Sequence, residues 1–175
     1  MAINKGYLTA KTNKENDEWY TPELAVKPLL KYIPKNSTIW CPFDKEKSAY
    51  VRLFKESGHN VIHSHIDEDK NFFFYEPPQS YNFIISNPPF SIKDLIIRRL
   101  YELDKPYAIL APLPTLQGQK RFPYMKDCQA LIFRDRIRFC LDEELTKIAK
   151  NPPFASIYIC KNFLPKDLIM EEINI

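Results

Sequence analysis

The sequence predicts an α/β fold with a mainly parallel central sheet flanked by helices, and three observations lead to this prediction. Short apolar runs typical of buried strands alternate with helix-like segments along much of the chain. The strand-like runs are apolar at nearly every residue, as expected for parallel strands covered on both faces. The length of 175 residues fits one domain with one core. We therefore expect a single domain over residues 19–175, preceded by a polar, lysine-rich arm at 1–18.

Prolines set the limits of the first helix. Thr21 followed by Pro22 is typical of an N-cap and first helical residue, and the apolar spacing continues up to Pro34. Pro28 lies inside this stretch and removes a backbone donor, so it should kink or divide the helix. The sequence thus predicts a helix over 21–33, in one piece or two.

The next three elements follow from β-propensity and capping residues. The β-prone run 38–43 reads as a strand that ends at a proline. Residues 48–57 then predict a helix, with Gly58 supplying the left-handed C-cap. A second strand is expected over 59–66, where apolar residues and histidines alternate.

The middle of the chain continues the alternation of strand and helix. The run 81–86 is nearly all apolar and predicts a strand buried on both faces. Residues 92–103 have the apolar spacing of a helix, and 107–113 form another buried strand ended by prolines. Three further runs predict strands in the tail: 130–133, 137–141 and 155–160. A short loop between two of them would give a C-terminal antiparallel hairpin.

Glycine usage excludes several nucleotide-binding motifs. Only Gly6, Gly58 and Gly118 occur, so neither GxGxxG nor GxxxxGK[ST] can be written anywhere in the chain. The net charge of +3 and the pI of about 8.6 permit an anionic partner without requiring one. The four cysteines are widely spaced and form no CxxC pair, which indicates reduced core thiols rather than a zinc ribbon or a redox dithiol.

The remaining composition points to a cytoplasmic protein without a metal. The start of the chain has no apolar signal segment and no run of about 18 apolar residues occurs, so we expect neither secretion nor membrane insertion. His63, His65 and Asp67 would share one strand face, which is the minimum geometry of a metal site. Because no distant fourth ligand is evident, we expect an exposed strand end or a cofactor-side cluster instead.

The segment Asn87-Pro88-Pro89-Phe90 carries the most chemistry, because it directly follows the buried strand at 81–86. The exocyclic amine of adenine is a poor nucleophile, so an enzyme that methylates it needs hydrogen-bond acceptors placed at that amine. The Asn87 side chain and the Pro88 carbonyl can supply two, while the prolines fix φ and bring no competing N–H. Phe90 can stack on the purine.

A plain strand-ending turn would use the same residues, and a second Asn-Pro-Pro-Phe at 151–154 shows how easily the tetrapeptide arises in a chain with 15 prolines. The first copy follows an apolar strand and precedes a helix. The second precedes a strand and follows only the polar residues 147–150. We therefore expect the first copy to be functional and the second to be a coincidence.

Two segments resemble the S-adenosylmethionine-dependent N6-adenine methyltransferases, in particular the short forms of phages and prophages. Asn87-Pro88-Pro89-Phe90 matches the catalytic (Asp/Asn/Ser)-Pro-Pro-(Tyr/Phe) motif of that family. Residues 17–23, Asp-Glu-Trp-Tyr-Thr-Pro-Glu, are similar to the N-terminal motif of the phage forms. The resemblance covers about residues 17 to 115 and implies a Rossmann-like methyltransferase fold, with S-adenosylmethionine as cofactor and adenine in nucleic acid as substrate.

The resemblance also implies roles for individual residues. The catalytic set is Asn87, Pro88, Pro89 and Phe90. The cofactor-binding set is Trp19, Tyr20, Thr21, Pro22, Phe43, Asp44 and Asp67, in which the first four border the methionine part and Asp67 holds the ribose. An enzyme encoded by a phage would act in the cytoplasm of the host cell.

One departure from the family supports a second hypothesis. Active relatives carry a Gly-x-Gly turn after the first strand, whereas this chain has residues 44–48, Asp-Lys-Glu-Lys-Ser, at that place. A Cβ disfavours positive φ and obstructs close approach of the backbone to a ligand. The alternative is therefore a catalytically inactive methyltransferase-like binding protein, such as a phage-encoded inhibitor of a host protein or a nucleic-acid-binding module.

Basic residues between Gly118 and Cys140 are interleaved with aromatic residues. On a strand, Arg134, Arg136 and Arg138 would share one face and could meet successive phosphates, although a solvated strand face would look the same. The residues expected to contact nucleic acid are Lys120, Arg121, Arg134, Arg136 and Arg138. DNA is the favoured partner over RNA. Because no stretch is left for a separate target-recognition domain, weak sequence specificity or a homodimer is expected.

Overall fold

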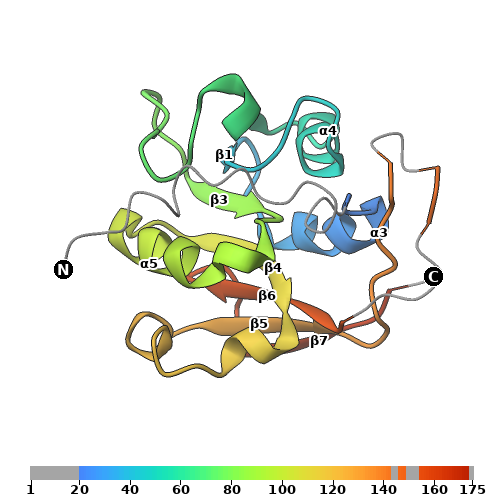
Figure 1. Ribbon diagram of the computed structural model, residues 1–175. Helices are drawn as coiled ribbons and strands as arrows, with labels where there is room; N and C mark the ends of the chain where they lie inside the picture. The colour runs from blue at the N-terminus through green and yellow to red at the C-terminus, as the bar shows by residue number, and fades with distance from the viewer. Residues whose placement is uncertain (1–19, 143–145, 149–153, 174–175) are drawn as a thin grey trace.

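A seven-stranded sheet forms the centre of the protein in the computed structural model, which describes residues 20–142, 146–148 and 154–173 (Figure 1). The strands are β1 (Thr38–Cys41), β2 (Asn60–His63), β3 (Phe83–Ser86), β4 (Tyr107–Pro112), β5 (Gln129–Phe133), β6 (Ser156–Lys161) and β7 (Leu168–Glu171). The α-helices are α3 (Glu23–Val26), α4 (Ala49–Glu56) and α5 (Lys93–Leu103). Short 3₁₀ turns are η1 (Lys27–Tyr32), η2 (Ile66–Glu68), η3 (Phe90–Ile92), η4 (Leu113–Leu116) and η5 (Phe122–Tyr124).

The order of the strands is β2-β1-β3-β4-β6-β5-β7, and the first four are parallel to one another. From β1 the chain moves outward to β2 and then crosses back to β3 on the other side of β1. The direction in which the chain adds strands therefore reverses between β1 and β3, and this place is the point where the sheet changes direction. Strand β6 runs antiparallel to both β4 and β5, and β7 is parallel to β5. The predicted fold class is therefore confirmed: a Rossmann-like, mainly parallel sheet with an antiparallel pair near its C-terminal edge.

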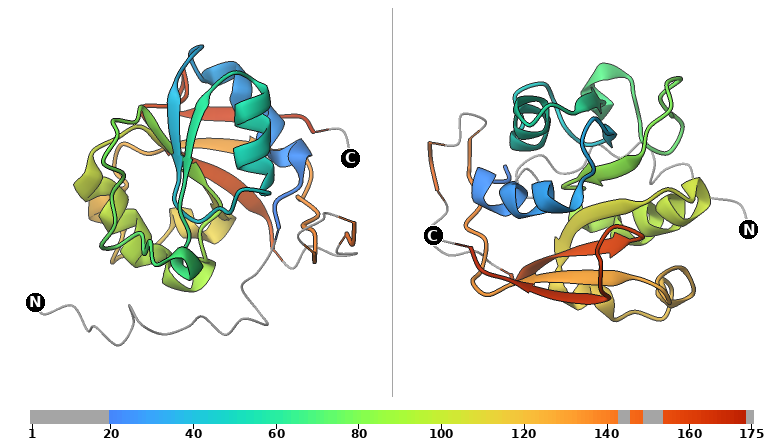
Figure 2. Two further views of the ribbon diagram at one scale, coloured as in Figure 1. Left: turned by 90° about the horizontal axis from the view of Figure 1, so that it is seen from above. Right: turned by 180° about the vertical axis from the view of Figure 1, so that it is seen from behind.

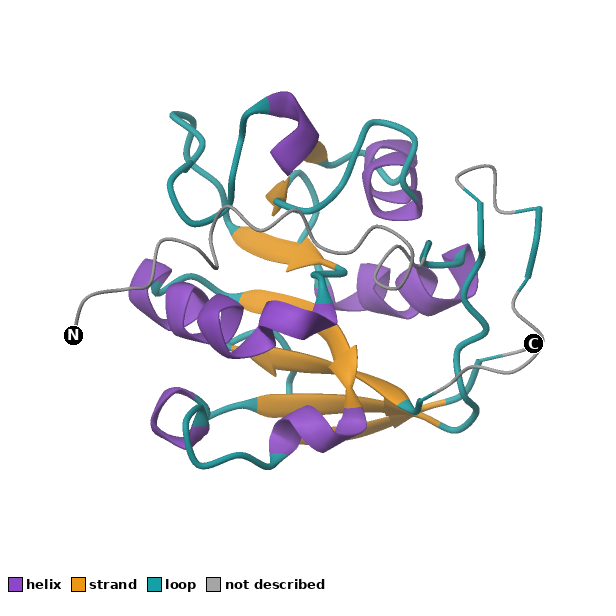
Figure 3. Cartoon of the chain, in the orientation of Figure 1, coloured by secondary structure: helices purple, strands orange, loops and turns teal. Residues whose placement is uncertain are grey.

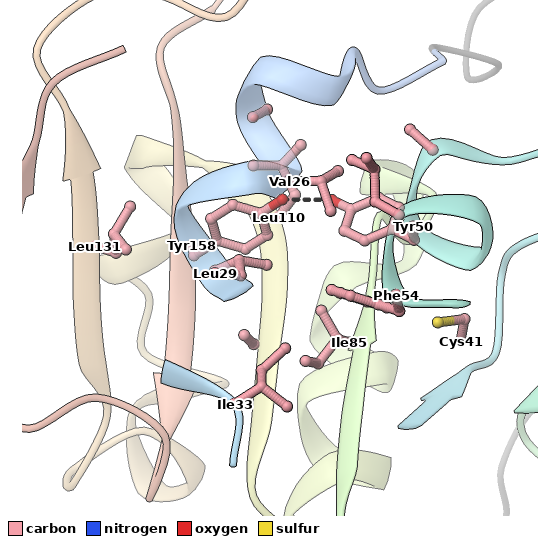
Figure 4. Packing of buried hydrophobic residues seen from close by; sticks show 14 of the residues in the cluster. Val26, Leu29, Ile33, Cys41, Tyr50, Phe54, Ile85, Leu110, Leu131 and Tyr158 are labelled. Carbon is pink, nitrogen blue, oxygen red and sulfur yellow. Dashed lines mark hydrogen bonds between the residues drawn. The ribbon is translucent and has the colours of Figure 1, made fainter. Parts of the chain in front are cut away.

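Helices cover both faces of the sheet, as Figure 2 shows. α3, η1 and α4 pack against one face, together with Ile85, Leu110 and Tyr158, in the core drawn in Figure 4. α5 packs against the other face, together with Ile84 and Ile109. Successive residues of a strand point to opposite faces, so the neighbours Ile84 and Ile85 enter different cores. This explains why the predicted strands are apolar at nearly every residue.

Local signals locate α4 well. The Ser48 hydroxyl accepts a hydrogen bond from the Val51 N–H at the first turn, and Gly58 adopts a φ of +82° just beyond the helix end. The left-handed glycine after the helix is the predicted C-cap, whereas the capping role of Ser48, expected as a residue of the helix itself, was not predicted. Figure 3 shows the alternation of strands and helices that continues from here to β4.

The first helix differs in detail from the prediction. It is divided into α3 and η1, and Pro28 lies at the start of η1, where its missing N–H costs least. The N-cap is Pro22 rather than Thr21, because the Thr21 side chain is buried and caps no helix. The division expected at Pro28 is confirmed, whereas the capping role of Thr21 is wrong.

The tail differs more. Residues 137–141 are not a strand of the sheet: Ile137 and Phe139 are buried, and only Cys140 makes isolated bridges, to Tyr20 and Ile148. The antiparallel pair is made by β5 and β6, which a long connection joins rather than a short loop. Strand β7, which pairs with β5 at the edge of the sheet, was not predicted.

Candidate active site

The candidate site lies where β1 and β3 end, at the point where the sheet changes direction. Ligands of open α/β sheets bind outside the carboxyl ends of the strands at such a point. The Ser86 hydroxyl, the last residue of β3, donates a hydrogen bond to Oδ2 of Asp44 and accepts one from the Phe43 N–H at 3.3 Å. Ser86 directly precedes Asn87, so these two hydrogen bonds tie the end of β3 to the turn after β1.

Asp44 is a buried acid, with 7% of its surface exposed. Burial raises the pKa of its carboxyl from 3.8 to about 6, although hydrogen bonds from Ser86 and Ser48 act in the opposite direction. The carboxyl therefore holds the turn in shape through Ser86 and Ser48.

The predicted catalytic tetrapeptide forms a rigid turn between β3 and α5. Asn87 is half-buried and its Oδ1 is shielded from solvent, while Pro88 is buried. Pro89 has the extended φ and ψ of −61° and 126° and leads directly into η3. The two prolines restrict this backbone, so the carbonyl of Pro88 and the side chain of Asn87 are held at the carboxyl edge of the sheet.

Phe90 has an aromatic partner that its position in the sequence does not reveal. The ring of Phe154 packs against it at a centroid distance of 5.1 Å and an angle of 85°, and Phe139 packs behind Phe154 at 5.7 Å. Phe154 is the last residue of the second Asn-Pro-Pro-Phe, whose first three residues lie outside the described part of the chain. The two copies therefore meet at their phenylalanines.

The N-terminal motif lies beside the same strand ends. Tyr20 and Cys140 exchange two backbone hydrogen bonds, of 3.0 and 2.9 Å. Thr21 and Pro22 are buried, while Trp19 lies outside the described residues. Thr21 neighbours the Tyr50 hydroxyl, which makes a hydrogen bond of 2.7 Å with that of Tyr158 (Figure 4).

These two tyrosines also neighbour Asp44. Burial is the main cause that raises the pKa of both Tyr50 and Tyr158, and the charge of Asp44 contributes in each case. The N-terminal motif, the turn after β1 and strand β6 are thus joined by one buried polar cluster, which consists of Thr21, Asp44, Tyr50, Ser86 and Tyr158.

Asp67 follows β2 and is engaged in a surface ion pair. Its carboxylate lies 3.0 Å from the Lys45 ammonium, and the two side chains are 43% and 44% exposed. Lys45 belongs to the segment after β1, residues 44–48, which contains no glycine. The neighbouring Glu46 pairs with Lys55 at 2.6 Å and with His63 at 2.8 Å. The acidic end of β2 is therefore linked to the turn after β1 by charge pairs that remain accessible to solvent.

Arg121 is a predicted nucleic-acid contact that the structure places in an internal clasp. Its guanidinium donates to the carbonyls of Thr115 at 2.6 Å and Gln117 at 2.7 Å, and it pairs with Asp94 in the first turn of α5. A Cβ at Gly118 would lie 2.5 Å from the Arg121 Cζ, so the guanidinium packs directly over the glycine. The clasp joins the loop after β4 to the helix that follows residues 87–90.

The other predicted contacts are exposed. Lys120, Arg136 and Arg138 are exposed and make no ion pair within the described residues, whereas Arg134 pairs with Asp135 at 2.9 Å and with Glu172 at 3.5 Å. Although the expected strand at 137–141 is absent, exposed arginines still alternate with buried residues. Strand β5 runs in the same direction as β4, so Arg136 and Arg138 follow it at the carboxyl edge of the sheet.

Sequence reasoning missed four residues that shape this edge: Lys45, Ser48, Ser86 and Asp94. Only Ser86 had a signal, because a polar residue that ends an apolar strand is typical of a strand end at a site. Within the described ranges, no helix is long and apolar enough to cross a membrane. The same ranges contain no group of three or more His, Cys, Asp or Glu side chains placed to hold a metal ion.

Comparison with known proteins gives distant structural similarity only. No protein-family model matches the sequence, and no curated protein matches it. The chain is similar to the crystal structure of the 23S rRNA methyltransferase ErmE, with 10% identity and a TM-score of 0.44 over 77% of this chain and 67% of that one. It is also similar to a "putative methyltransferase from Thermoplasma acidophilum", with 12% identity and a TM-score of 0.35 over 78% of this chain and 60% of that one.

Proposed function

We propose that this protein transfers a methyl group from S-adenosylmethionine to the N6 amine of adenine in nucleic acid. The observation that carries the proposal is the position of Asn87-Pro88-Pro89-Phe90, at the carboxyl end of β3 and beside the point where the sheet changes direction. Ligands bind at that point in open α/β sheets, and the tetrapeptide brings an amide and a rigid backbone carbonyl to it.

The tetrapeptide acts on the amine of the substrate. Asn87 Oδ1 and the Pro88 carbonyl accept its two hydrogens, which favours a tetrahedral nitrogen with an available lone pair. S-adenosylmethionine supplies, when bound, an electrophilic methyl group on a sulfonium. Asn87 and Pro88 would hold the amine with its lone pair directed at that methyl group, and the proton that the amine loses on transfer would leave to solvent. Because Oδ1 is shielded in this structure, the Asn87 side chain turns outward, or its covering atoms move, when adenine enters.

The residues around the switch point fit the cofactor in part. Asp67 presents a partly exposed carboxylate at the end of β2, and a carboxylate can accept hydrogen bonds from both ribose hydroxyls. The Phe43 ring packs on Phe72 at a centroid distance of 4.9 Å and would form an apolar wall of the cofactor site. Asp44 supports the turn after β1 through its hydrogen bond from Ser86. Tyr20, Thr21 and Pro22, together with Trp19, would border the methionine part.

Exposed cations at the carboxyl edge suit a nucleic-acid substrate. Arg136 and Arg138 follow β5 at this edge, and Lys120 lies in the loop after β4 that Arg121 holds. Arginine and lysine side chains neutralise phosphates and release counterions, which gives binding without sequence preference. DNA is the favoured substrate.

The test is methyl transfer to single-stranded DNA, duplex DNA and RNA, followed by mass spectrometry of N6-methyladenine in nuclease digests. Wild type should methylate at least one substrate, and Asn87→Ala should lose at least about a hundredfold in rate, since one acceptor of this kind contributes roughly 10²–10³. Asn60→Ala, at the amino end of β2, is the matched control and should retain activity. Equal rates for Asn87→Ala and wild type would refute the role of Asn87.

A second candidate function is a methyltransferase-like binding protein without catalysis, and the Lys45–Asp67 ion pair favours it. The Lys45 ammonium pairs with the Asp67 carboxylate, which is the group proposed to bind the ribose. The glycine turn of active relatives is also missing after β1. Calorimetric titration with S-adenosylmethionine and with S-adenosylhomocysteine separates the two candidates. Micromolar binding supports the enzyme, whereas no binding of either compound, even with nucleic acid present, supports the binding protein.

A further inference from the structure

A cavity of about 210 Å³ lies at the opposite end of the sheet from the candidate active site. It opens where β4 begins and β6 ends, since Tyr107 and Lys161 are paired across these two strands and both line it. The end of α5 and the segment around η5 complete the wall through Tyr101 and Tyr124. None of these residues belongs to the site proposed for methyl transfer.

Tyr107 brings a hydroxyl to the wall of this cavity. The residue is 1% exposed, and within the described ranges its hydroxyl makes no hydrogen bond. A hydroxyl that lines a cavity and makes no hydrogen bond within the protein can pair with water or with a ligand. A tyrosine hydroxyl both donates and accepts, so it can pair with a ring nitrogen, an amine or a carbonyl of a bound molecule.

Two aromatic rings form the side of the cavity. Tyr101 and Tyr124 pack edge to face at a centroid distance of 5.4 Å, and Tyr101 is 50% exposed. The Lys161 ammonium lies 5.3 Å from the centre of the Tyr101 ring and is held there by Asp104 at 2.9 Å. Exposed tyrosine faces next to a cation are the surfaces on which nucleobases stack.

The rim carries charges of both signs. Lys126 and Asp127 are exposed neighbours, and neither makes an ion pair within the described part of the chain. An ammonium attracts phosphate, while a carboxylate accepts hydrogen bonds from sugar hydroxyls or an exocyclic amine. This combination selects a molecule with an anionic group and hydrogen-bond donors over a bare anion.

We propose that this cavity is a second binding site, which takes one nucleotide. The base stacks beside Tyr101 and Tyr124 and pairs with the Tyr107 hydroxyl, and the phosphate meets Lys126 at the rim. The volume is below the range of about 300–1,000 Å³ of sites that enclose drug-sized ligands, so the cavity holds the ring and leaves the phosphate at its mouth. The nucleotide is either free or part of a nucleic-acid strand, because both present the same base and phosphate.

The test is an NMR and calorimetric titration of the full-length protein with AMP, GMP, CMP and UMP, with a short single-stranded oligonucleotide, and with inorganic phosphate as the bare anion. A nucleotide should shift the amide signals of Tyr101, Tyr124 and Lys126. Tyr107→Phe, which removes only the hydroxyl, should weaken its binding about threefold to tenfold. Tyr124→Ala should weaken it about tenfold or more, through lost stacking.

Two controls separate this site from the proposed active site. Tyr32→Phe, remote from the cavity, should bind the nucleotide as wild type does, and in Asn87→Ala the shifts of the Tyr101, Tyr124 and Lys126 amides should follow the same titration curve as in wild type, so failure of methyl transfer would not affect this result. If Tyr124→Ala does not fold, Lys126→Ala at the exposed rim replaces it. Tighter binding of the oligonucleotide than of the best mononucleotide identifies a strand as the source, and the reverse identifies a free nucleotide. No shift at these amides up to millimolar concentration, binding of phosphate alone, or equal affinities of wild type, Tyr107→Phe and Tyr124→Ala would overturn the proposal.

Discussion

The ring of Phe154 packs edge to face against the ring of Phe90, with the centroids 5.1 Å apart. This contact brings the end of the second Asn-Pro-Pro-Phe onto the end of the first, although the sequence indicates no relation between them. A substrate base that stacks on Phe90 would therefore lie close to Phe154. The segment before β6 thus borders the proposed substrate site.

Phe154→Ala should lower the free energy of unfolding by about 1–3 kcal/mol. A fully buried phenylalanine costs about 3–5 kcal/mol on truncation, and Phe154 is only partly buried. Urea unfolding followed by tryptophan fluorescence measures the change. Phe74→Ala is the control, because that side chain is 72% exposed and should cost little. Equal losses for the two variants would show that the contact with Phe90 contributes nothing.

Asp44→Asn should change how stability depends on pH. Burial raises the pKa of Asp44 from 3.8 to about 6, so the native state binds this proton more tightly than the unfolded chain does. The unfolding free energy of the wild type therefore falls as the pH rises from about 4 to about 6, because Asp44 must ionise while buried. The uncharged amide of Asp44→Asn does not titrate, so the variant has no such fall. Relative to wild type, the variant should gain up to about 3 kcal/mol of unfolding free energy between pH 4 and pH 7.

The measurement is urea unfolding of both proteins at several pH values from 4 to 7. Asp127→Asn, which changes an exposed carboxylate, is followed through the same series as the control. A constant difference between Asp44→Asn and wild type at every pH would contradict the raised pKa.

Arg121→Ala and Gly118→Ala should each destabilise the loop that follows β4. Arginine hydrogen bonds to carbonyls and a carboxylate contribute about 1.5–3 kcal/mol, and a Cβ at Gly118 would push the guanidinium out of place. Because both changes remove the same clasp, the double variant should lose less stability than the sum of the two. Hydrogen exchange at residues 114–121 and urea unfolding check this, with the exposed Lys120→Ala as the control. Additive losses would mean that Gly118 and Arg121 act independently.

Lys45→Ala and Asp67→Asn should have opposite effects on binding of S-adenosylmethionine. Removal of Lys45 frees the Asp67 carboxylate at small cost, since exposed ion pairs contribute about 0–1 kcal/mol, so affinity should rise about twofold to threefold. Asp67→Asn removes the charged acceptor and should weaken binding about tenfold. Calorimetric titration measures both, with Lys47→Ala as the matched control. Weaker binding by Lys45→Ala would show that the lysine itself contacts the cofactor.

Local signals account for much of the fold and for the core of the candidate site. Ser48 and Gly58 delimit α4 through contacts within a few residues, and Pro28 divides the first helix through its own missing donor. The buried strand at 83–86 predicts that Asn87 lies at its carboxyl end. Ligands of open α/β sheets bind at this end of the parallel strands.

Where local and long-range effects compete, the prediction failed. The run 137–141 has the β-propensity of a strand, yet it lies outside the sheet, and among the described residues its bridges are those of Cys140 to Tyr20 and Ile148. The place next to β5 is taken instead by β7, whose short mixed sequence gives a weak strand signal. Propensity cannot decide which of two segments pairs with a neighbour, because pairing depends on register and on the packing behind it.

The sequence by itself determined the alternation of strands and helices, the turn at Asn87 and the lack of glycine after β1, since each depends on residues that are adjacent or a few positions apart. Only the tertiary structure decided that Ser86 bonds to Asp44, 42 residues away, and that Arg121 clasps Asp94, 27 residues away. The contact between Phe154 and Phe90 and the cavity lined by Tyr107 and Lys161 also depend on the tertiary structure. Such contacts depend on the order of the strands and on how side chains share the space between elements, and no local pattern specifies either.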